Sequence, residues 1–291
     1  MPQTRAAQPE QPDRDRAAVQ AERVFANILC AVDGTHRSMT AVQQAAVLAG
    51  PQGHLTVLAV TAVQGEGQYH AAVISPARAA RILAQAEQIA IEEKVPCTTV
   101  LDPAGPPSEV ILERAAEYDL LTLGAPPSTP LGGMITDGVA VSALGSLPTP
   151  MLIARPLPSA EDAFARRIVV ASDGLEHSDA LVDLAIRLAR AHDANVILVH
   201  AIGVESRSHP HRIQEQAHRL EEALGSACEL RVEADDAADA VIRTAGQTGA
   251  SLIVASSRRL EGLQAIGSVS RRLVHSAHCS VLLVPPERLR G

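Results

Sequence analysis

Two aspartates and one glycine-serine pair are the residues of this chain whose types and positions could do chemistry. Asp33 and Asp173 each follow an apolar run of strand length and stand directly before a glycine. A carboxylate in such a turn can contact a ligand, or it can simply cap the backbone amides of the helix that follows. Gly267 and Ser268 begin a predicted helix, where backbone amides, a hydroxyl and the positive helix end favour a phosphate.

The two aspartates hold the same place in a duplicated unit, 140 positions apart. Downstream segments repeat as well: residues 55–60 match 196–201, Cys97 matches Cys228, and residues 120–123 match 252–255. The repeat is far longer than a solenoid unit, so each copy is expected to be a complete domain. The predicted organisation is a disordered tail (residues 1–24), a first domain (25–157) and a second domain (158–291).

Each unit alternates apolar runs of strand length with helical stretches. In the first unit, strands are predicted at 27–32, 55–60, 97–101, 120–123 and 151–154, and helices at 37–48, 76–94, 108–117 and 139–144. In the second, strands are predicted at 168–171, 196–200, 229–232, 252–255 and 281–284, and helices at 178–191, 211–224, 237–248 and 268–276.

This alternation predicts an α/β fold with two open, parallel, five-stranded sheets that carry helices on both faces. Asp33 and Asp173 then stand at the carboxyl ends of the first strands, where such sheets bind ligands. The last strand of each unit is short, apolar and soon followed by proline, so it would otherwise be an exposed apolar edge. We therefore expect the two last strands to pair across a pseudo-twofold axis, within or between chains.

Composition and charge exclude several classes of partner. The net charge is −8, with two Phe, two Tyr and no Trp, which argues against nucleic acid. The N-terminal residues form neither a signal peptide nor a membrane span, so a cytoplasmic protein without a membrane partner is expected. The four cysteines form no CxxC pair and lie in or beside apolar runs; buried, reduced thiols are expected at Cys30, Cys97, Cys228 and Cys279.

Three histidines could in principle chelate a metal. His209, His211 and His218 cluster where the second helix of the second unit begins, but no cysteine or acidic residue completes a set at suitable spacing. We therefore interpret these histidines as part of a solvated polar surface, and no metal site is predicted.

The repeated strand, Asp-Gly, three residues and Ser, followed by a helix, resembles the universal stress protein family in its tandem form. Ser256–Arg259 and Gly267–Leu273 add to the resemblance, which covers nearly all of residues 25–286. It implies sheets of strand order 3-2-1-4-5, like those of adenine nucleotide alpha hydrolases, and pairing through the last strands. Many members bind ATP through Gly-x-x-Gly, nine residues, then Gly-Ser/Thr. In them the loop cradles phosphates and ribose, and the first-strand aspartate lies near adenine and ribose.

The first unit departs from that loop pattern at several positions. Gly124 is present, but Pro127 stands at the second glycine position, ten residues precede Gly138, and Val139 replaces the hydroxyl residue. Pro127 has no amide proton to donate and Val139 has no hydroxyl. The first unit is therefore not expected to hold a triphosphate.

The second unit keeps more of the pattern. Ser256 and Arg259 occupy the glycine positions, and only seven residues separate Arg259 from Gly267. Charge-assisted bonds from Arg258 and Arg259 could replace lost amide contacts, although the two arginines could also belong to a solvated loop. A weak ATP site, or a site for a smaller phosphate ligand, is expected in the second domain only. The candidate ligand contacts are Asp173, Ser256, Arg258, Arg259, Gly267, Ser268, Val269 and Ser270, with Asp33, Gly124 and Gly138 as their first-unit counterparts.

Catalysis is not expected, because the chain lacks Gly-x-Ser-x-Gly, a Walker lysine and the Ser-Gly-Gly-x-Asp-Ser loop of ATP pyrophosphatases. The leading hypothesis is a non-catalytic stress-response binding or regulatory module with a weakened adenine-nucleotide site in its second domain. One alternative is a nucleotide-free interaction module that dimerises through the sheet edge; another is a slow ATP hydrolase. A homodimer is expected in addition to the pairing of the two domains.

Overall fold

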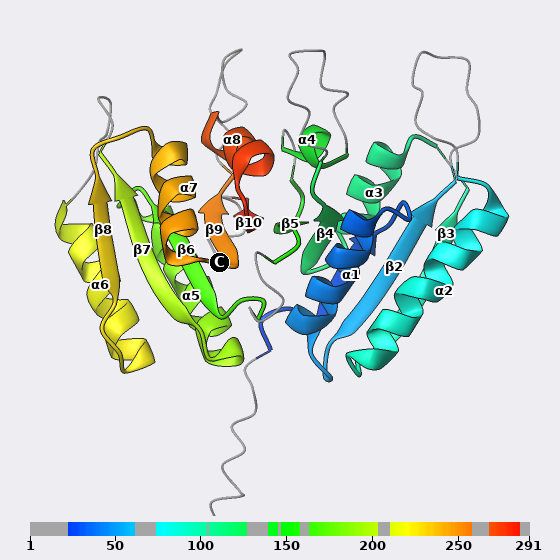
Figure 1. Ribbon diagram of the computed structural model, residues 1–291, viewed down its shortest axis with the longest axis horizontal. Coiled ribbons are helices and arrows are strands. Elements are labelled where there is room, and N and C mark those ends of the chain that lie inside the picture. The colour runs from blue at the N-terminus through cyan, green and yellow to red at the C-terminus, as the bar shows by residue number, and fades with distance from the viewer. Residues whose placement is uncertain are drawn as a thin grey trace, which may run out of the picture.

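The computed structural model describes residues 23–61, 74–103, 105–126, 139–144, 147–157, 163–202, 210–257 and 268–285. Within these ranges, ten strands form one continuous sheet in the order β3-β2-β1-β4-β5-β10-β9-β6-β7-β8, with helices on both faces (Figure 1). The predicted α/β class is confirmed, and each half has the order 3-2-1-4-5 counted from its own outer edge. The predicted tail lies largely outside the described residues.

The elements follow the predicted alternation. The first half contains β1 (Asn27–Ala31), α1 (His36–Ala49), β2 (His54–Val60), α2 (Pro76–Glu92), β3 (Cys97–Asp102), α3 (Pro107–Ala115), β4 (Leu120–Gly124), α4 (Val139–Ala143) and β5 (Met151–Ala154). The second half contains β6 (Arg167–Ser172), α5 (His177–His192), β7 (Asn195–Ala201), α6 (Pro210–Leu224), β8 (Glu229–Glu233), α7 (Ala237–Thr248), β9 (Leu252–Ser256), α8 (Ser268–Ser276) and β10 (Ser280–Val284).

Two helix ends differ from the prediction by two residues, and the other ends of the elements agree with it to within one residue. The helix expected to reach Lys94 ends at Glu92, because Lys94 has a φ of 59° and leaves the right-handed region. The helix expected to reach Glu117 ends at Ala115; beyond it, the amides of Glu117 and Tyr118 bond to carbonyls only three residues back. In both cases the helix is shorter than predicted at its C-terminus, because the residues of a last helical turn are the ones that sequence patterns assign least reliably.

The last strands of the two halves pair antiparallel within the chain, which confirms the predicted contact. Leu152 faces Leu282, and the flanking pairs are Met151 with Leu283 and Ile153 with Val281. Leu152 and Leu282 hold the same position in each copy. A pseudo-twofold axis that passes between Leu152 and Leu282 therefore relates the two halves, and neither strand is left as an open edge.

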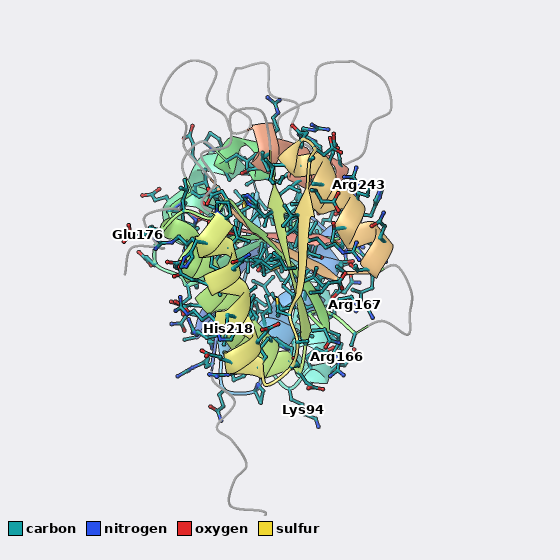
Figure 2. All side chains as sticks on the ribbon, turned by 90° about the vertical axis from the view of Figure 1, so that its left-hand side faces the viewer. Lys94, Arg166, Arg167, Glu176, His218 and Arg243 are labelled. Carbon is teal, nitrogen blue, oxygen red and sulfur yellow. The ribbon has the colours of Figure 1, made fainter. Side chains whose placement is uncertain are left out.

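Two apolar layers run without interruption through both halves. One packs α1, α2, α5 and α6 on the sheet, and the other packs α3, α4, α7 and α8 on the opposite face. In Figure 2, α6 with His218 and α7 with Arg243 lie on opposite sides of the strands. Alanine, valine, leucine and isoleucine dominate both layers.

The cysteines are free thiols in this core. Cys30 and Cys279 are buried, and Cys97 and Cys228 are partly buried. Burial raises the pKa of the Cys228 and Cys279 thiols to about 11, so both thiols are protonated at neutral pH. In the described part of the chain, no helix is long and apolar enough to cross a bilayer.

Candidate functional site

Asp33 lies in the turn between β1 and α1, where it shapes the start of the helix. Its Oδ1 accepts hydrogen bonds from the amide of Thr35 at 2.9 Å and from the Thr35 hydroxyl at 2.7 Å. Thr35 is the N-cap of α1 and accepts a bond from the amide of Ser38 at 3.3 Å. Desolvation alone would raise the pKa of Asp33, but the bonds from Thr35 and Ser38 lower it. The capping interpretation therefore accounts for this carboxylate without a ligand.

Asp173 makes the corresponding turn in the second half with different partners. Its Oδ1 accepts a bond from the amide of Leu175 at 2.9 Å and another from the hydroxyl of Ser178 at 2.7 Å. The glycines after the two aspartates, Gly34 and Gly174, have φ of 79° and 70°, which only glycine adopts without strain. The turn is thus shared by both copies, and any difference in binding must come from its surroundings.

In the first half, apolar groups and backbone fill the surroundings of the turn. A Cβ on Gly34 would lie 2.5 Å from Cδ1 of Ile82, so the Ile82 side chain of α2 rests directly on the turn. A Cβ on Gly124 would lie 2.7 Å from the carbonyl carbon of Arg37 and 2.8 Å from the amide nitrogen of Ser38. Gly124 is therefore required by close packing of β4 against the first turn of α1, a role that the sequence motif does not indicate.

In the second half, the residues at the carboxyl ends of the strands beside the turn are polar, and we call them the floor of the site. Ser172 is in register with His200 on β7, and Ser172 and Ser256 hold corresponding positions, each two residues beyond the paired Val170 and Val254. Residues in one such row point to one face of a parallel sheet. The equivalent row of the first half, from the matching register, is Gly124, Val32 and Ala59.

A hydrogen-bond network joins this polar row to α6. The Ser172 hydroxyl donates to Oε1 of Gln216 at 2.6 Å and accepts from the amide of Gly174 at 3.1 Å. Nε2 of Gln216 donates to Oδ1 of Asp179 at 2.6 Å, and Arg212 donates to Oδ2 of the same carboxylate at 2.6 Å. Desolvation would raise the pKa of Asp179, but the bonds from Arg212 and Gln216 lower it, so the carboxylate is ionised at neutral pH.

Two polar atoms of the row are buried without a partner in the described part of the chain. Nδ1 of His200 lies 2.9 Å from the carbonyl oxygen of Ser172, which can only accept, so Nδ1 carries a proton and donates to that oxygen. Nε2 of His200 and the hydroxyl of Ser256 have no hydrogen-bond partner among the described residues. His200 is only 3 % exposed. The floor of the second half therefore retains hydrogen-bonding capacity that the protein itself does not use.

The start of α8 is fastened to this floor. Ser270 is buried, and its hydroxyl donates to the carbonyl oxygen of Ser256 at 3.3 Å. Ser268 and Val269 precede it in the first turn of the helix. The other predicted contacts, Gly138, Arg258, Arg259 and Gly267, lie outside the described residues, as does Pro127.

Sequence reasoning located the aspartates but missed Ser172, Asp179, His200 and Gln216. A signal was present, because an alignment of the two copies puts Val32 and Met39 opposite Ser172 and Asp179. Polar residues in one copy at positions that are apolar in the other mark a site at which the copies have diverged.

Two of the three histidines weighed as metal ligands, His211 and His218, lie on the exposed face of α6. Nδ1 of His211 is 3.1 Å from a carboxylate oxygen of Glu215, and Nε2 of His218 is 3.3 Å from one of Glu222. His209 falls outside the described residues. In the described ranges, no three His, Cys, Asp or Glu side chains are grouped so that they could hold a metal ion.

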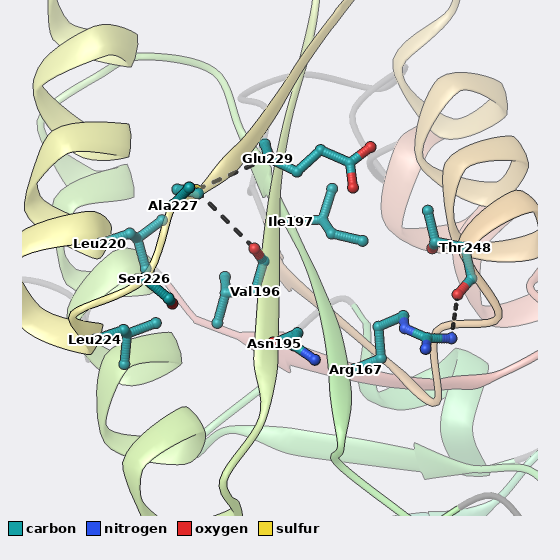
Figure 3. A pocket seen from close by; sticks show the side chains of 11 residues that line it. Arg167, Asn195, Val196, Ile197, Leu220, Leu224, Ser226, Ala227, Glu229 and Thr248 are labelled. Atoms are coloured by element: carbon teal, nitrogen blue, oxygen red, sulfur yellow. Dashed lines mark hydrogen bonds between the residues drawn. The ribbon is translucent and has the colours of Figure 1, made fainter.

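A cavity of about 390 Å³ lies at the other end of the second-half strands (Figure 3). Leu220 and Leu224 of α6 line it together with Val196, Cys228 and Arg167. Arg167 donates to the carbonyl oxygens of Thr248 and Gly249. Because these residues lie at the amino ends of the strands, the cavity is not part of the crevice beside Asp173.

Comparisons with known proteins agree with the fold. The family model described as "Universal stress protein family" matches residues 25–155 and again 165–285. The crystal structure of a universal stress protein from Archaeoglobus fulgidus DSM 4304 is similar with a TM-score of 0.70 and 16% identity, over 90% of this chain and 97% of that one. A protein of unknown function from Pseudomonas aeruginosa PAO1 is similar with a TM-score of 0.63 and 20% identity, over 92% and 95%. No curated protein matches the chain.

Proposed function

The chain belongs to the universal stress protein family as a tandem two-domain member, and from this premise we propose that it is a non-catalytic, cytoplasmic stress-response module whose second half binds an adenine nucleotide weakly. The proposal keeps the domain boundaries expected from the sequence, 25–157 and 158–291. Its first half serves as the structural partner of the second and binds no nucleotide.

The observation that carries the proposal is a pair of buried polar atoms without a partner among the described residues, at the carboxyl ends of the strands that flank β6, the strand that leads into Asp173. Each such atom costs about 1–3 kcal/mol when it stays unsatisfied. His200 Nε2 and the Ser256 hydroxyl lie in one row at the carboxyl edge of the sheet, where open α/β sheets bind ligands. A nucleotide has hydroxyl and amino groups that can supply the missing bonds, so binding recovers part of this cost.

Phosphate binding in this proposal depends on the loop before α8. Ser268 begins α8 and Gly267 precedes it in the sequence, so a phosphate bound there would meet backbone amides and the positive end of the helix dipole. Arg258 and Arg259 precede them in the chain and offer charge-assisted bonds. Because both glycine positions of the loop are substituted, we expect ATP to bind more weakly than in a loop with the full pattern.

The first half supports the same assignment by contrast. Ile82 packs on Gly34, and Val32 and Ala59 offer no polar atom beyond their backbone. In the sequence, Pro127 and Val139 remove an amide and a hydroxyl from the first loop. A nucleotide would therefore have to displace apolar packing there and would gain few hydrogen bonds.

A second candidate is a nucleotide-free interaction module that also forms a homodimer. The outermost strands of the sheet favour it, because Leu101 on β3 is 41% exposed and Val232 on β8 is 52% exposed. The backbone of an edge strand that exposes apolar side chains can pair with a strand of another chain. Slow ATP hydrolysis stays a third hypothesis without a supporting observation in the described residues.

Calorimetric titration with ATP tests the proposal, with a matched pair of variants. Asp173→Ala and Asp33→Ala remove equivalent carboxylates, each of which accepts a hydrogen bond from the amide two residues on. We expect Asp173→Ala to weaken ATP binding about tenfold, the effect of one lost charged hydrogen bond, and Asp33→Ala to leave it unchanged. The reverse ranking would assign the nucleotide to the first half. No heat from the parent protein at millimolar ATP would favour the interaction module.

A further inference from the structure

Helices α2 and α6 hold equivalent positions in the two halves and differ at one buried position. Each begins at a proline, Pro76 or Pro210, and six residues later stands Ile82 or Gln216. The buried positions of the two helices coincide: Ala79, Ile82, Leu83 and Ala86 correspond to Ile213, Gln216, Ala217 and Leu220. An amide in the second half therefore replaces an isoleucine in the first, on the helix face that packs against the sheet.

Both side chains act on the Asp-Gly turn of their own half. Ile82 rests on Gly34 by direct apolar contact. Gln216, which is 2 % exposed, reaches the turn through Ser172, whose oxygen accepts the bond from the amide of Gly174. The second turn is thus joined to α6 by directional hydrogen bonds, whereas the first turn meets α2 only through the apolar contact of Ile82 among the described contacts.

The hydrogen bonds of the second half have one consistent direction. Asp179 can only accept, so Nε2 of Gln216 faces it and Oε1 must face the Ser172 hydroxyl. The Ser172 hydroxyl donates its hydrogen bond to Gln216, so the Ser172 oxygen can accept a hydrogen bond from the amide of Gly174. Arg212 fixes the Asp179 carboxylate from the other side. The orientation of the amide is therefore determined by its neighbours.

Ser172 is also held by its backbone, since its carbonyl oxygen accepts the bond from Nδ1 of His200. The residue immediately before Asp173 is thus fixed by α6 through its side chain and by β7 through its main chain. The turn that carries Asp173 is therefore held from both sides before a ligand arrives, and preorganisation of this kind lowers the cost of binding.

We propose that Gln216 is the positioning residue of the second-half site: through Ser172 it holds the Asp173–Gly174 turn in the geometry that the nucleotide requires. The inference rests on the proposed function and adds the cause of the difference between the halves. The Asp-Gly turn is present in both, so the turn alone does not make a site. The network of Gln216, Ser172 and Asp179 makes the second turn competent, and the packing of Ile82, Val32 and Met39 leaves the first one incompetent.

The test transplants the first-half residues into the second half. Gln216→Ile alone leaves the Ser172 hydroxyl and one oxygen of Asp179 without their partner, so we expect both a lower melting temperature and an ATP affinity reduced about tenfold or more. The triple variant Ser172→Val, Asp179→Met, Gln216→Ile replaces these three polar residues together by the apolar residues of the first half, and it leaves the partly exposed Arg212 to solvent. It should regain part of the melting temperature that Gln216→Ile loses, and its ATP affinity should stay low.

Ile82→Gln is the matched control, because it makes the converse change in the half that is not expected to bind; ATP affinity should equal that of the parent. If the triple variant binds ATP as the parent does, packing alone suffices and the positioning role is overturned while the nucleotide site stands. If the parent itself binds no ATP, the proposed function fails and the positioning role fails with it. Calorimetry on the four proteins separates these results.

Discussion

The hydroxyl of Ser280 donates a 2.7 Å hydrogen bond to Oε1 of Gln44 and so joins the last strand of the second half to the first helix of the first half. Nε2 of Gln44 donates to the carbonyl oxygen of Arg155 at 2.7 Å, and the Arg155 amide donates to the Ser280 hydroxyl at 2.9 Å. The guanidinium of Arg155 donates to the carbonyl oxygens of Val274 and Cys279 near the end of α8, and burial lowers its pKa. The first half therefore caps a helix whose other end carries the candidate phosphate site.

The hydrogen-bonded cluster of Gln44, Arg155 and Ser280 occurs on only one side of the pseudo-twofold axis in the described residues. The positions equivalent to Gln44, Arg155 and Ser280 are Leu184, Pro285 and Pro150, which have neither the side-chain amide, the backbone N–H nor the hydroxyl. The contact between the halves is thus polar on one side and apolar on the other.

Gln44→Leu inserts the residue of the equivalent position and should destabilise the protein by about 1–3 kcal/mol, because it leaves the Ser280 hydroxyl and the Arg155 carbonyl oxygen buried without Gln44. Urea unfolding of Gln44→Leu, Ser280→Ala and the double variant measures the coupling. The two effects should be less than additive, since both changes remove the same bond. Strict additivity would show that the bond contributes nothing across the halves.

Gly34→Ala should destabilise the protein more than Gly225→Ala. Both glycines have positive φ, which costs a residue with a Cβ about 1–2 kcal/mol. The space around Gly225 is open, whereas a Cβ on Gly34 meets Ile82, which adds about 1 kcal/mol of overpacking. In an Ile82→Ala background the difference between the two variants should shrink. An equal cost for both in the parent would contradict the close packing on the first turn.

Asp179 should contribute to the acid sensitivity of the second half. Its folded-state pKa is lowered from 3.8, so the unfolded chain takes up a proton first as the pH falls. The stabilisation is therefore fully present above about pH 4 and is lost as the pH falls through the folded-state pKa. Urea unfolding of the parent and of Asp179→Asn at a series of pH values should show a steeper acid loss for the parent. Parallel curves would mean that the Asp179 carboxylate gains nothing from Arg212 and Gln216.

Most of the framework could be predicted from the sequence, because apolar periodicity and the duplicated Asp-Gly turn are local signals. Met151–Ala154 and Ala237–Thr248 occur with the predicted bounds. The end of α2 was missed because the left-handed conformation of Lys94 has no local signature of the kind that glycine provides.

The site was only half predictable for a related reason. Asp33 and Asp173 stand in recognisable turns, but the link from Ser172 to Gln216 spans 44 positions of the chain and depends on how α6 packs on β6. For Gly124, the sequence pointed to the correct residue but to a different role. The loop motif associates it with phosphate, and the structure gives it a packing role against Arg37 and Ser38.

The most direct test of the central claim is a titration of the isotopically labelled protein with ATP, followed by amide resonances in NMR spectra. The amides of Asp173, Gly174 and Leu175 should shift, while those of Asp33, Gly34 and Thr35 stay in place, because the second turn is joined through Ser172 to a polar floor with unused hydrogen-bonding capacity, whereas Ile82 packs on the first turn. Shifts at the first turn alone, or at neither turn up to millimolar ATP, would contradict a nucleotide site in the second half.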